Sequence, residues 1–146
     1  MREKTQRHKM TQSSTEKIHK PLTEREKWLA PQIIDIAITV HKYLGPGLLE
    51  SVYEKCFCYE LIKRRIPFVK QKCIELIYDN LIIDEGLRID ILADDLIIIE
   101  LKAQETYHLV WEAQLLSYLK LTHKRLGYIL NFNTPLMKDG IKRMIL

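Results

Sequence analysis

The pattern of apolar and polar positions divides the chain into helical and extended segments. Apolar residues recur at helical spacing over 32–44, 48–64 and 109–124. Shorter alternating or continuously apolar runs predict strands at 73–78, 81–84, 88–102 and 126–132, and a final short strand or turn at 141–145. This order predicts an α/β (α+β) sandwich, in which a central mixed sheet contains an antiparallel meander and is flanked by helices.

The ends of the first helix carry clear signals. Pro31 is predicted to begin it, and the Gly45-Pro46-Gly47 run ends it. Before it, Thr23 and Glu26 have the spacing of a capping box and are predicted to cap a short turn.

Three charged residues interrupt the most apolar part of the chain, residues 88–102. Asp90, Glu100 and Lys102 stand in strands that otherwise consist of Ile and Leu, where an unpaired charge is costly. Glu100 and Lys102 are two apart and so share a face, while Leu101 points to the other. Asp90 joins that face only if the loop between Ala93 and Ile97 has an odd length or a bulge, which we therefore predict.

These residues fit two different roles. Two carboxylates with the Leu101 backbone carbonyl between them form a hard oxygen site suited to Mg²⁺ or Mn²⁺, and Lys102 can serve the attacking water. The alternative is an ordinary ion pair of Glu100 with Lys102 at a strand end, with Asp90 in solvent.

Helical segments add further polar candidates. Glu50 lies in the first turn of the second helix, where the helix dipole also explains an acid, and Glu60 is a second choice for a buried acid. Gln114 and Tyr118 are four apart on the third helix. His41 is more typical of a packed or capping residue, and we leave it out of the site.

Composition and charge restrict the setting. Residues 1–27 hold eight Lys and Arg against four Asp and Glu, whereas the rest of the chain holds fifteen of each, so the +4 excess lies in the amino-terminal segment. We predict a basic disordered tail over 1–24 and one domain over 25–146. Local basic clusters remain candidates for phosphate contact or for solvated element ends: 63–65 with 70 and 72, 120–125, and 138–143.

Cysteines and hydropathy indicate the compartment. Cys56, Cys58 and Cys73 have no paired metal spacing and are expected to be reduced, partly buried thiols. Neither a signal peptide nor a membrane span is expected, and so we predict a cytoplasmic protein.

Three motifs resemble those of known nucleases. Residues 47–53 fit the pattern of the GxxExxY protein family; Asp90 with 100–102 fits the signature of the PD-(D/E)XK nuclease superfamily, to which that family is assigned. Residues 114–118 resemble the QxxxY motif of RecB-type nuclease domains. The similarity spans 33–146, and Ile89 stands where the superfamily's name has proline.

The resemblance implies a restriction-endonuclease-like core and a role for each motif residue. Asp90, Glu100 and the Leu101 carbonyl would bind the metal, with a contribution from Glu50, and Lys102 would serve the water. Gln114 and Tyr118 would position the site or the nucleic-acid backbone.

The expected function is a magnesium-dependent nuclease that hydrolyses phosphodiester bonds, in DNA rather than RNA. The alternative is a non-catalytic module that keeps the fold and binds nucleic acid or a protein. A homodimer is left open.

Overall fold

The computed structural model describes residues 20–146, so the predicted tail lies, up to residue 19, outside the described residues. The elements follow the chain in this order: α1 (Glu24–Leu44), α2 (Glu50–Lys63), β1 (Phe68–Cys73), β2 (Leu76–Tyr78), β3 (Leu81–Ile83), β4 (Arg88–Ala93), β5 (Ile97–Lys102), α3 (Val110–Thr122), β6 (Leu126–Asn131), the 3₁₀ turn η1 (Met137–Gly140) and β7 (Ile141–Ile145).

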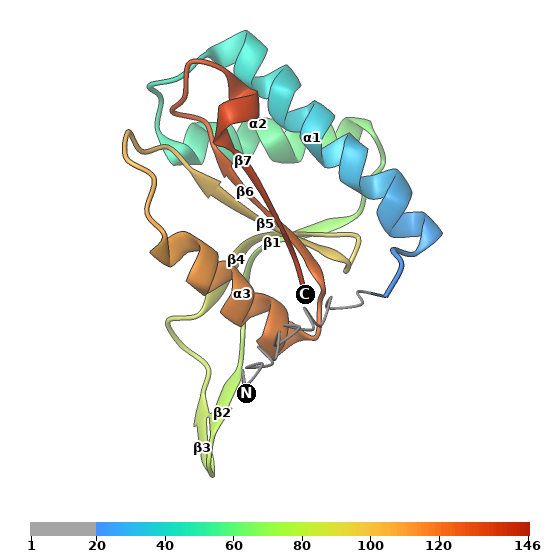
Figure 1. The fold of residues 1–146 in the computed structure, drawn as a ribbon, viewed down its shortest axis with the longest axis vertical. Helices are drawn as coiled ribbons and strands as arrows, with labels where there is room; N and C mark the ends of the chain where they lie inside the picture. Colours follow the sequence, from blue (N-terminus) through green and yellow to red (C-terminus); the bar gives the residue numbers. More distant parts are fainter. Residues whose placement is uncertain (1–19) are drawn as a thin grey trace, which may run out of the picture.

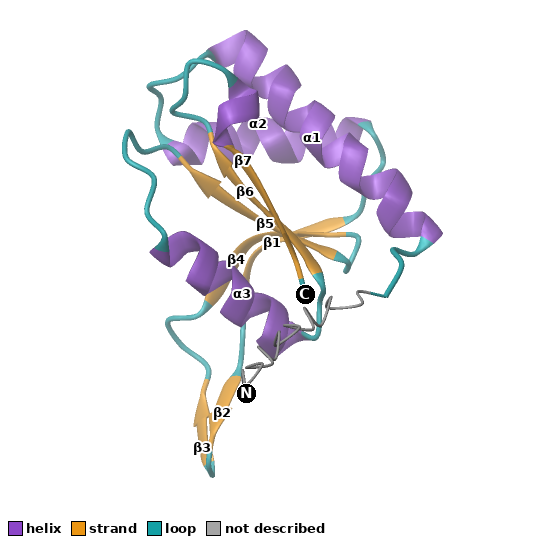
Figure 2. Cartoon of the chain, viewed as in Figure 1, coloured by secondary structure: helices purple, strands orange, loops and turns teal. Residues whose placement is uncertain are grey.

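Five of these strands form one mixed sheet in the order β1-β4-β5-β6-β7. The β5–β6 pair is parallel and the other pairs are antiparallel. Helices α1 and α2 cover one face, and α3 covers the other (Figure 1, Figure 2). The predicted α+β architecture with helices on both faces of a mixed sheet is therefore confirmed.

Strand β5 lies at the centre of this sheet and is buried on both faces. Ile99 and Leu101 belong to the core under α1 and α2, whereas Ile98 belongs to the core under α3. A central strand with helices on both sides needs apolar residues at nearly every position, which explains the unbroken run. Glu100 is the exception, on the same side of the strand as Ile98.

The predicted meander is wrong in one respect. The strand expected over 73–78 is interrupted, and β2 pairs only with β3 in a separate ribbon. The neighbour of β4 is instead β1, which the apolar pattern did not indicate. Five of the six residues of β1 are exposed, so this edge strand has no alternation of buried and exposed positions to detect.

Helix α1 begins earlier than predicted. It starts at Glu24 and continues through Pro31, although proline lacks the N–H that a helix interior uses. The predicted capping box is present, because Glu26 N donates to Thr23 Oγ1 (3.2 Å) and Thr23 N donates to Glu26 Oε1 (2.9 Å). The cap therefore begins the long helix itself rather than a short turn before it.

We expect Thr23→Ala to lower the free energy of unfolding by about 1 kcal/mol, because the first turn loses a side-chain acceptor. Urea unfolding followed by circular dichroism measures the change. Thr39→Ala is the matched control: Thr39 is exposed in the middle of α1, where Ala is the better helix former. Equal losses in the two variants would contradict a capping role.

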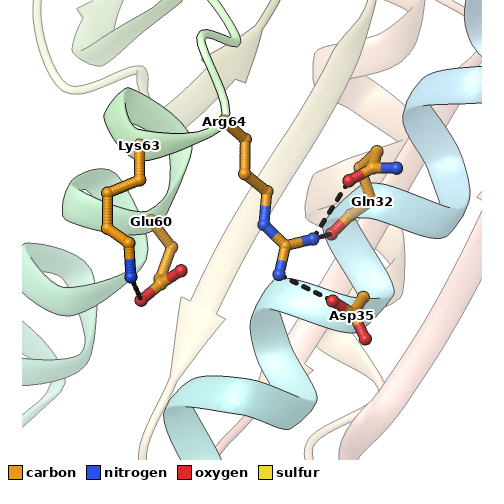
Figure 3. Close-up of polar contacts among 5 residues, drawn as sticks. All are labelled: Gln32, Asp35, Glu60, Lys63 and Arg64. Carbon is orange, nitrogen blue, oxygen red and sulfur yellow. Dashed lines mark hydrogen bonds and ion pairs between the residues drawn. The ribbon is translucent and has the colours of Figure 1, made fainter.

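A polar bridge ties the end of α2 to α1. Arg64 follows α2 and donates to Gln32 Oε1 (3.0 Å) and to Asp35 Oδ2 (2.6 Å), both on α1 (Figure 3). The preceding residue, Lys63, donates to Glu60 Oε1 within α2 at 3.1 Å. The Arg64 contacts fix the spacing of the two helices at this end of the pair.

The cysteines differ in their surroundings. All three are free; Cys58 is buried, Cys56 is partly buried and Cys73 is exposed, so the expected partial burial is wrong for Cys73. Burial, followed by the charge of Glu54, raises the pKa of Cys58 to about 11. Across residues 20–146, no helix combines the length and apolar character that crossing a bilayer requires.

Candidate active site

The turn between β4 and β5 determines which side chains share a face. Ala93 pairs with Ile97, so the turn has three residues, and two of them, Asp94 and Asp95, have φ of 50° and 54°. Asp and Asn tolerate this left-handed conformation better than most residues. The predicted odd loop length is confirmed, and it places Asp90 and Glu100 on one face.

Asp90 and Glu100 are joined through hydrogen bonds to the backbone. Leu101 N donates to Asp90 Oδ2 at 2.9 Å, and Asp90 N donates to Glu100 Oε1 at 3.3 Å. Ile91 and Ile99 are the last residues that pair between β4 and β5. Beyond them, these side-chain hydrogen bonds take the place of backbone–backbone hydrogen bonds. Two carboxylates are thus brought together where β4 and β5 separate.

This proximity has an electrostatic cost. Glu100 is only 4% exposed. Burial raises its pKa well above the ordinary range, and the charge of Asp90 raises it further, while Lys102 lowers it. A buried carboxyl with a second carboxylate beside it holds its proton strongly unless a cation is present.

Lys102 lies on the same face but does not neutralise this pair directly. Its Nζ is 5.4 Å from the centre of the Trp111 ring on α3, a cation–π contact. Within residues 20–146, no ion pair of 4.0 Å or less includes Lys102 or Glu100. The alternative of an ordinary Glu100–Lys102 ion pair is therefore not what the structure shows.

Glu50 approaches from the other layer of helices, as the first residue of α2. Partial burial raises its pKa, and Asp90 raises it further, whereas Lys102 lowers it. Glu50 therefore lies within electrostatic reach of both residues, although as a residue it is exposed. The first-turn position alone would have favoured the charged form.

The turn that presents Glu50 is held by Tyr53. Its hydroxyl donates to Gly45 O (2.6 Å) and accepts from Leu48 N (3.2 Å), and its ring stacks on Phe132 at 4.5 Å. Gly47 has φ of 98°, a conformation that favours glycine. The spacing of Gly47, Glu50 and Tyr53 thus has a structural reason: the glycine turns the chain, and the tyrosine anchors it.

The two candidates on α3 differ in their surroundings. Tyr118 is buried; burial raises its pKa, a backbone hydrogen bond from Arg88 lowers it, and Glu100 and Asp90 raise it. Its hydroxyl therefore lies near the carboxylates. Gln114 is exposed, one turn earlier on the helix, and within the described residues its side chain makes no hydrogen bond.

Two supporting residues were missed by sequence reasoning. Trp111 contacts Lys102 and is itself flanked by Tyr107 (5.1 Å between ring centres). Asn131 is buried at the end of β6, where its side chain donates to Gln104 O (2.9 Å) and accepts from Gln104 N (3.2 Å). Asn131 thereby fixes the loop that follows Lys102. The sequence signal that could have identified Asn131 is a polar residue at the end of an apolar strand.

The oxygen atoms at this site suit a hard cation that is bound by two carboxylates, those of Asp90 and Glu100, rather than by three. Among residues 20–146, no three His, Cys, Asp or Glu side chains lie close enough together to hold a metal ion. Mg²⁺ needs only one or two carboxylates because it keeps several waters. The N–H and C=O of one residue point to the same side of a strand, so the Leu101 carbonyl faces Asp90. The ligand role of Glu50 stays a prediction.

Other sequence candidates lie away from this site. His41 is buried, with Nε2 2.7 Å from Thr134 O, which agrees with a packed residue. Glu60 is partly buried and pairs with Lys63. Several residues of the basic clusters form ion pairs within the domain: Arg64 with Asp35, Lys124 with Asp95, Arg125 with Glu26, and Lys142 with Glu112.

Comparison with known proteins gives one family match. The family model described as the PD-(D/E)XK nuclease superfamily matches residues 27–144, which includes every residue discussed for the site. Neither curated proteins nor solved structures give a match.

Proposed function

Because the chain belongs to the PD-(D/E)XK nuclease superfamily, we propose that it is a metal-dependent nuclease that hydrolyses phosphodiester bonds in DNA. The observation that carries the proposal is the Asp90–Glu100 pair, two adjoining carboxylates that no lysine or arginine neutralises within 4.0 Å in the described chain. A buried acid with a second carboxylate beside it is costly in a merely structural role. A bound cation would remove the cost.

In this proposal each residue has a role that suits its position. Asp90, Glu100 and the Leu101 carbonyl would hold Mg²⁺ or Mn²⁺, with a contribution from Glu50. A bound ion would supply positive charge for the phosphate and would make the attacking water more acidic. Lys102 donates to the attacking water or to the phosphate oxygens, and the Trp111 ring holds its ammonium group in place.

Helix α3 supplies the substrate contacts of the proposed site. Tyr118, buried near the carboxylates, orients the site, and exposed Gln114 donates to a backbone phosphate. The spacing of Gly47, Glu50 and Tyr53 supports assignment to the GxxExxY family within the superfamily. We propose residues 25–146, together with the α1 cap at Thr23, as the catalytic domain.

The test is cleavage of single- and double-stranded DNA with Mg²⁺ or Mn²⁺ by the wild type, Glu100→Ala and Lys102→Ala. We expect cleavage by the wild type only, and none when the metal is chelated. An RNA of the same sequence tests the preference for DNA. Equal activity in all three proteins would indicate a contaminating nuclease and would contradict the proposal.

A second candidate is a binding module that keeps the nuclease fold without catalysis. It is favoured by the balance of charge after residue 27 and by the use of several basic residues in internal ion pairs. Calorimetric titration with MnCl₂ separates the two. A nuclease binds the metal at a site that is lost in Glu100→Ala, whereas a module that binds DNA without metal shows no such site.

A further inference from the structure

The ribbon of β2 and β3 exposes apolar side chains that a small protein normally buries. It projects from the sheet at the end of the molecule opposite α1 and α2 (Figure 1). Two cross-strand pairs, Ile77 with Ile82 and Tyr78 with Leu81, are between 59% and 71% exposed. Successive positions of a strand point to opposite faces, so both faces of the ribbon are apolar. A two-stranded ribbon is marginally stable in water unless something packs on it.

The charge of the ribbon restricts what can cover it. Residues 74–87 contain four acids, Glu75, Asp79, Asp84 and Glu85, and no Lys, Arg or His. Within residues 20–146, none of the four forms an ion pair. Nucleic acid would be repelled by this charge, so the ribbon does not serve as a DNA-binding arm. Its partner is expected to be apolar and basic.

A surface with this chemistry exists on the same chain. A groove of about 690 Å³ lies between α1 and α2, a size typical of pockets that enclose a drug-sized molecule. Val40, Leu44 and Cys56 line it together with two strongly exposed tyrosines, Tyr43 (89%) and Tyr59 (63%).

The rim of this groove is basic. Lys42, Lys55 and Lys63 line it, and its one acid, Glu60, is already paired with Lys63, as Figure 3 shows. The Arg64 bridge to α1 holds the two walls at a fixed spacing. Lys42 and Lys55 form no ion pair within residues 20–146. The groove thus offers a preformed aromatic and apolar surface with positive charge at its rim.

We propose that the β2–β3 ribbon of one copy of the chain docks in the α1–α2 groove of a second copy. The β2–β3 ribbon lies at one end of the longest axis, and helices α1 and α2, whose residues line the groove, lie toward the other, so a chain cannot fill its own groove (Figure 1). Two antiparallel copies related by a two-fold axis make the contact twice, which closes the assembly as a dimer. The contact places the acidic ribbon against the lysine rim and covers both apolar surfaces.

Sedimentation velocity of the full chain tests this, with two charge-reversal variants. The ribbon variant is Glu75→Lys with Glu85→Lys, and the groove variant is Lys42→Glu with Lys55→Glu. We expect the wild type to dimerise with rising concentration and each variant alone to stay monomeric. An equimolar mixture of the two variants is expected to associate again, because the two new lysines of the ribbon now meet the two new glutamates of the groove.

The control is Lys120→Glu with Lys138→Glu, which changes the net charge as the groove variant does, at exposed positions outside the groove. It should dimerise as the wild type does, and circular dichroism should show that all variants are folded. A monomeric wild type at every concentration, or a mixture of variants that does not associate, would overturn the proposal. So would a groove variant that loses binding of an oligonucleotide but still dimerises, because the groove would then belong to nucleic acid.

Discussion

Replacing Asp90 with Asn is expected to abolish binding of Mg²⁺ or Mn²⁺ and to lower the rate of DNA cleavage by roughly a thousandfold or more. The proposed site has only two carboxylates at its centre, so the loss of one charge leaves too few anionic ligands for a hard cation. Metal ions supply several kcal/mol of transition-state stabilisation, and about 4 kcal/mol corresponds to a factor of roughly a thousand in rate. Calorimetric titration and a cleavage assay on the same preparation measure the two effects.

The substitution is chosen so that the fold survives. The Asn side chain keeps an oxygen that can accept from Leu101 N, as Asp90 Oδ2 does at 2.9 Å. Asp95→Asn is the matched control, since Asp95 lies in the turn of the same hairpin and its left-handed conformation suits Asn. We expect the control to cleave DNA like the wild type. Retained cleavage in Asp90→Asn would remove Asp90 from the site.

The face shared by Asp90 and Glu100 was predictable from the sequence alone. The side chains of a strand alternate with a strict period of two. Asp90 and Glu100 can therefore share a face only if the loop between Ala93 and Ile97 has an odd length or contains a bulge. The three-residue turn confirms this expectation. The central sheet and its helices were predictable for a similar reason, because burial on both faces leaves an apolar run.

The remaining errors come from segments where local pattern and tertiary packing disagree. Strand β1 is an exposed edge and carries no alternation, so only its pairing with β4 identifies it. Helix α1 passes through Pro31 because its capping box at Thr23 and the buried side chains of Leu29 and Ala30 stabilise the first turns. Propensity is a weak prior that such packing overrides.

Contacts that close across loops were not predictable at all. The Tyr53 hydroxyl returns to Gly45, and the Lys102 ammonium group lies over Trp111. No regular spacing in the sequence indicates either contact, because the loops that bring the residues together have no fixed geometry. The motif residues could be selected from the sequence, but the contacts that hold them in place could not.

At pH values above the ordinary pKa of a glutamate, Glu100→Gln is expected to make the metal-free protein more stable than the wild type. Burial and the charge of Asp90 raise the pKa of Glu100 in the folded state, so the folded protein binds this proton more tightly than the unfolded chain. The stability of the wild type therefore falls as the pH rises from the unfolded pKa to the folded pKa. One proton contributes a slope of about 1.4 kcal/mol per pH unit, which Gln removes.

Urea unfolding in chelator across this pH window measures the difference between Glu100→Gln and the wild type. The two proteins should be equally stable below the ordinary glutamate pKa and diverge above it. Glu105→Gln, at an exposed position in the loop after β5, is the control and should keep the wild-type slope. Added MnCl₂ should stabilise the wild type and the Glu105→Gln control but not Glu100→Gln, because the ion binds the folded carboxylates. A Glu100→Gln protein less stable than the wild type at neutral pH would indicate that Glu100 serves the fold rather than a cation.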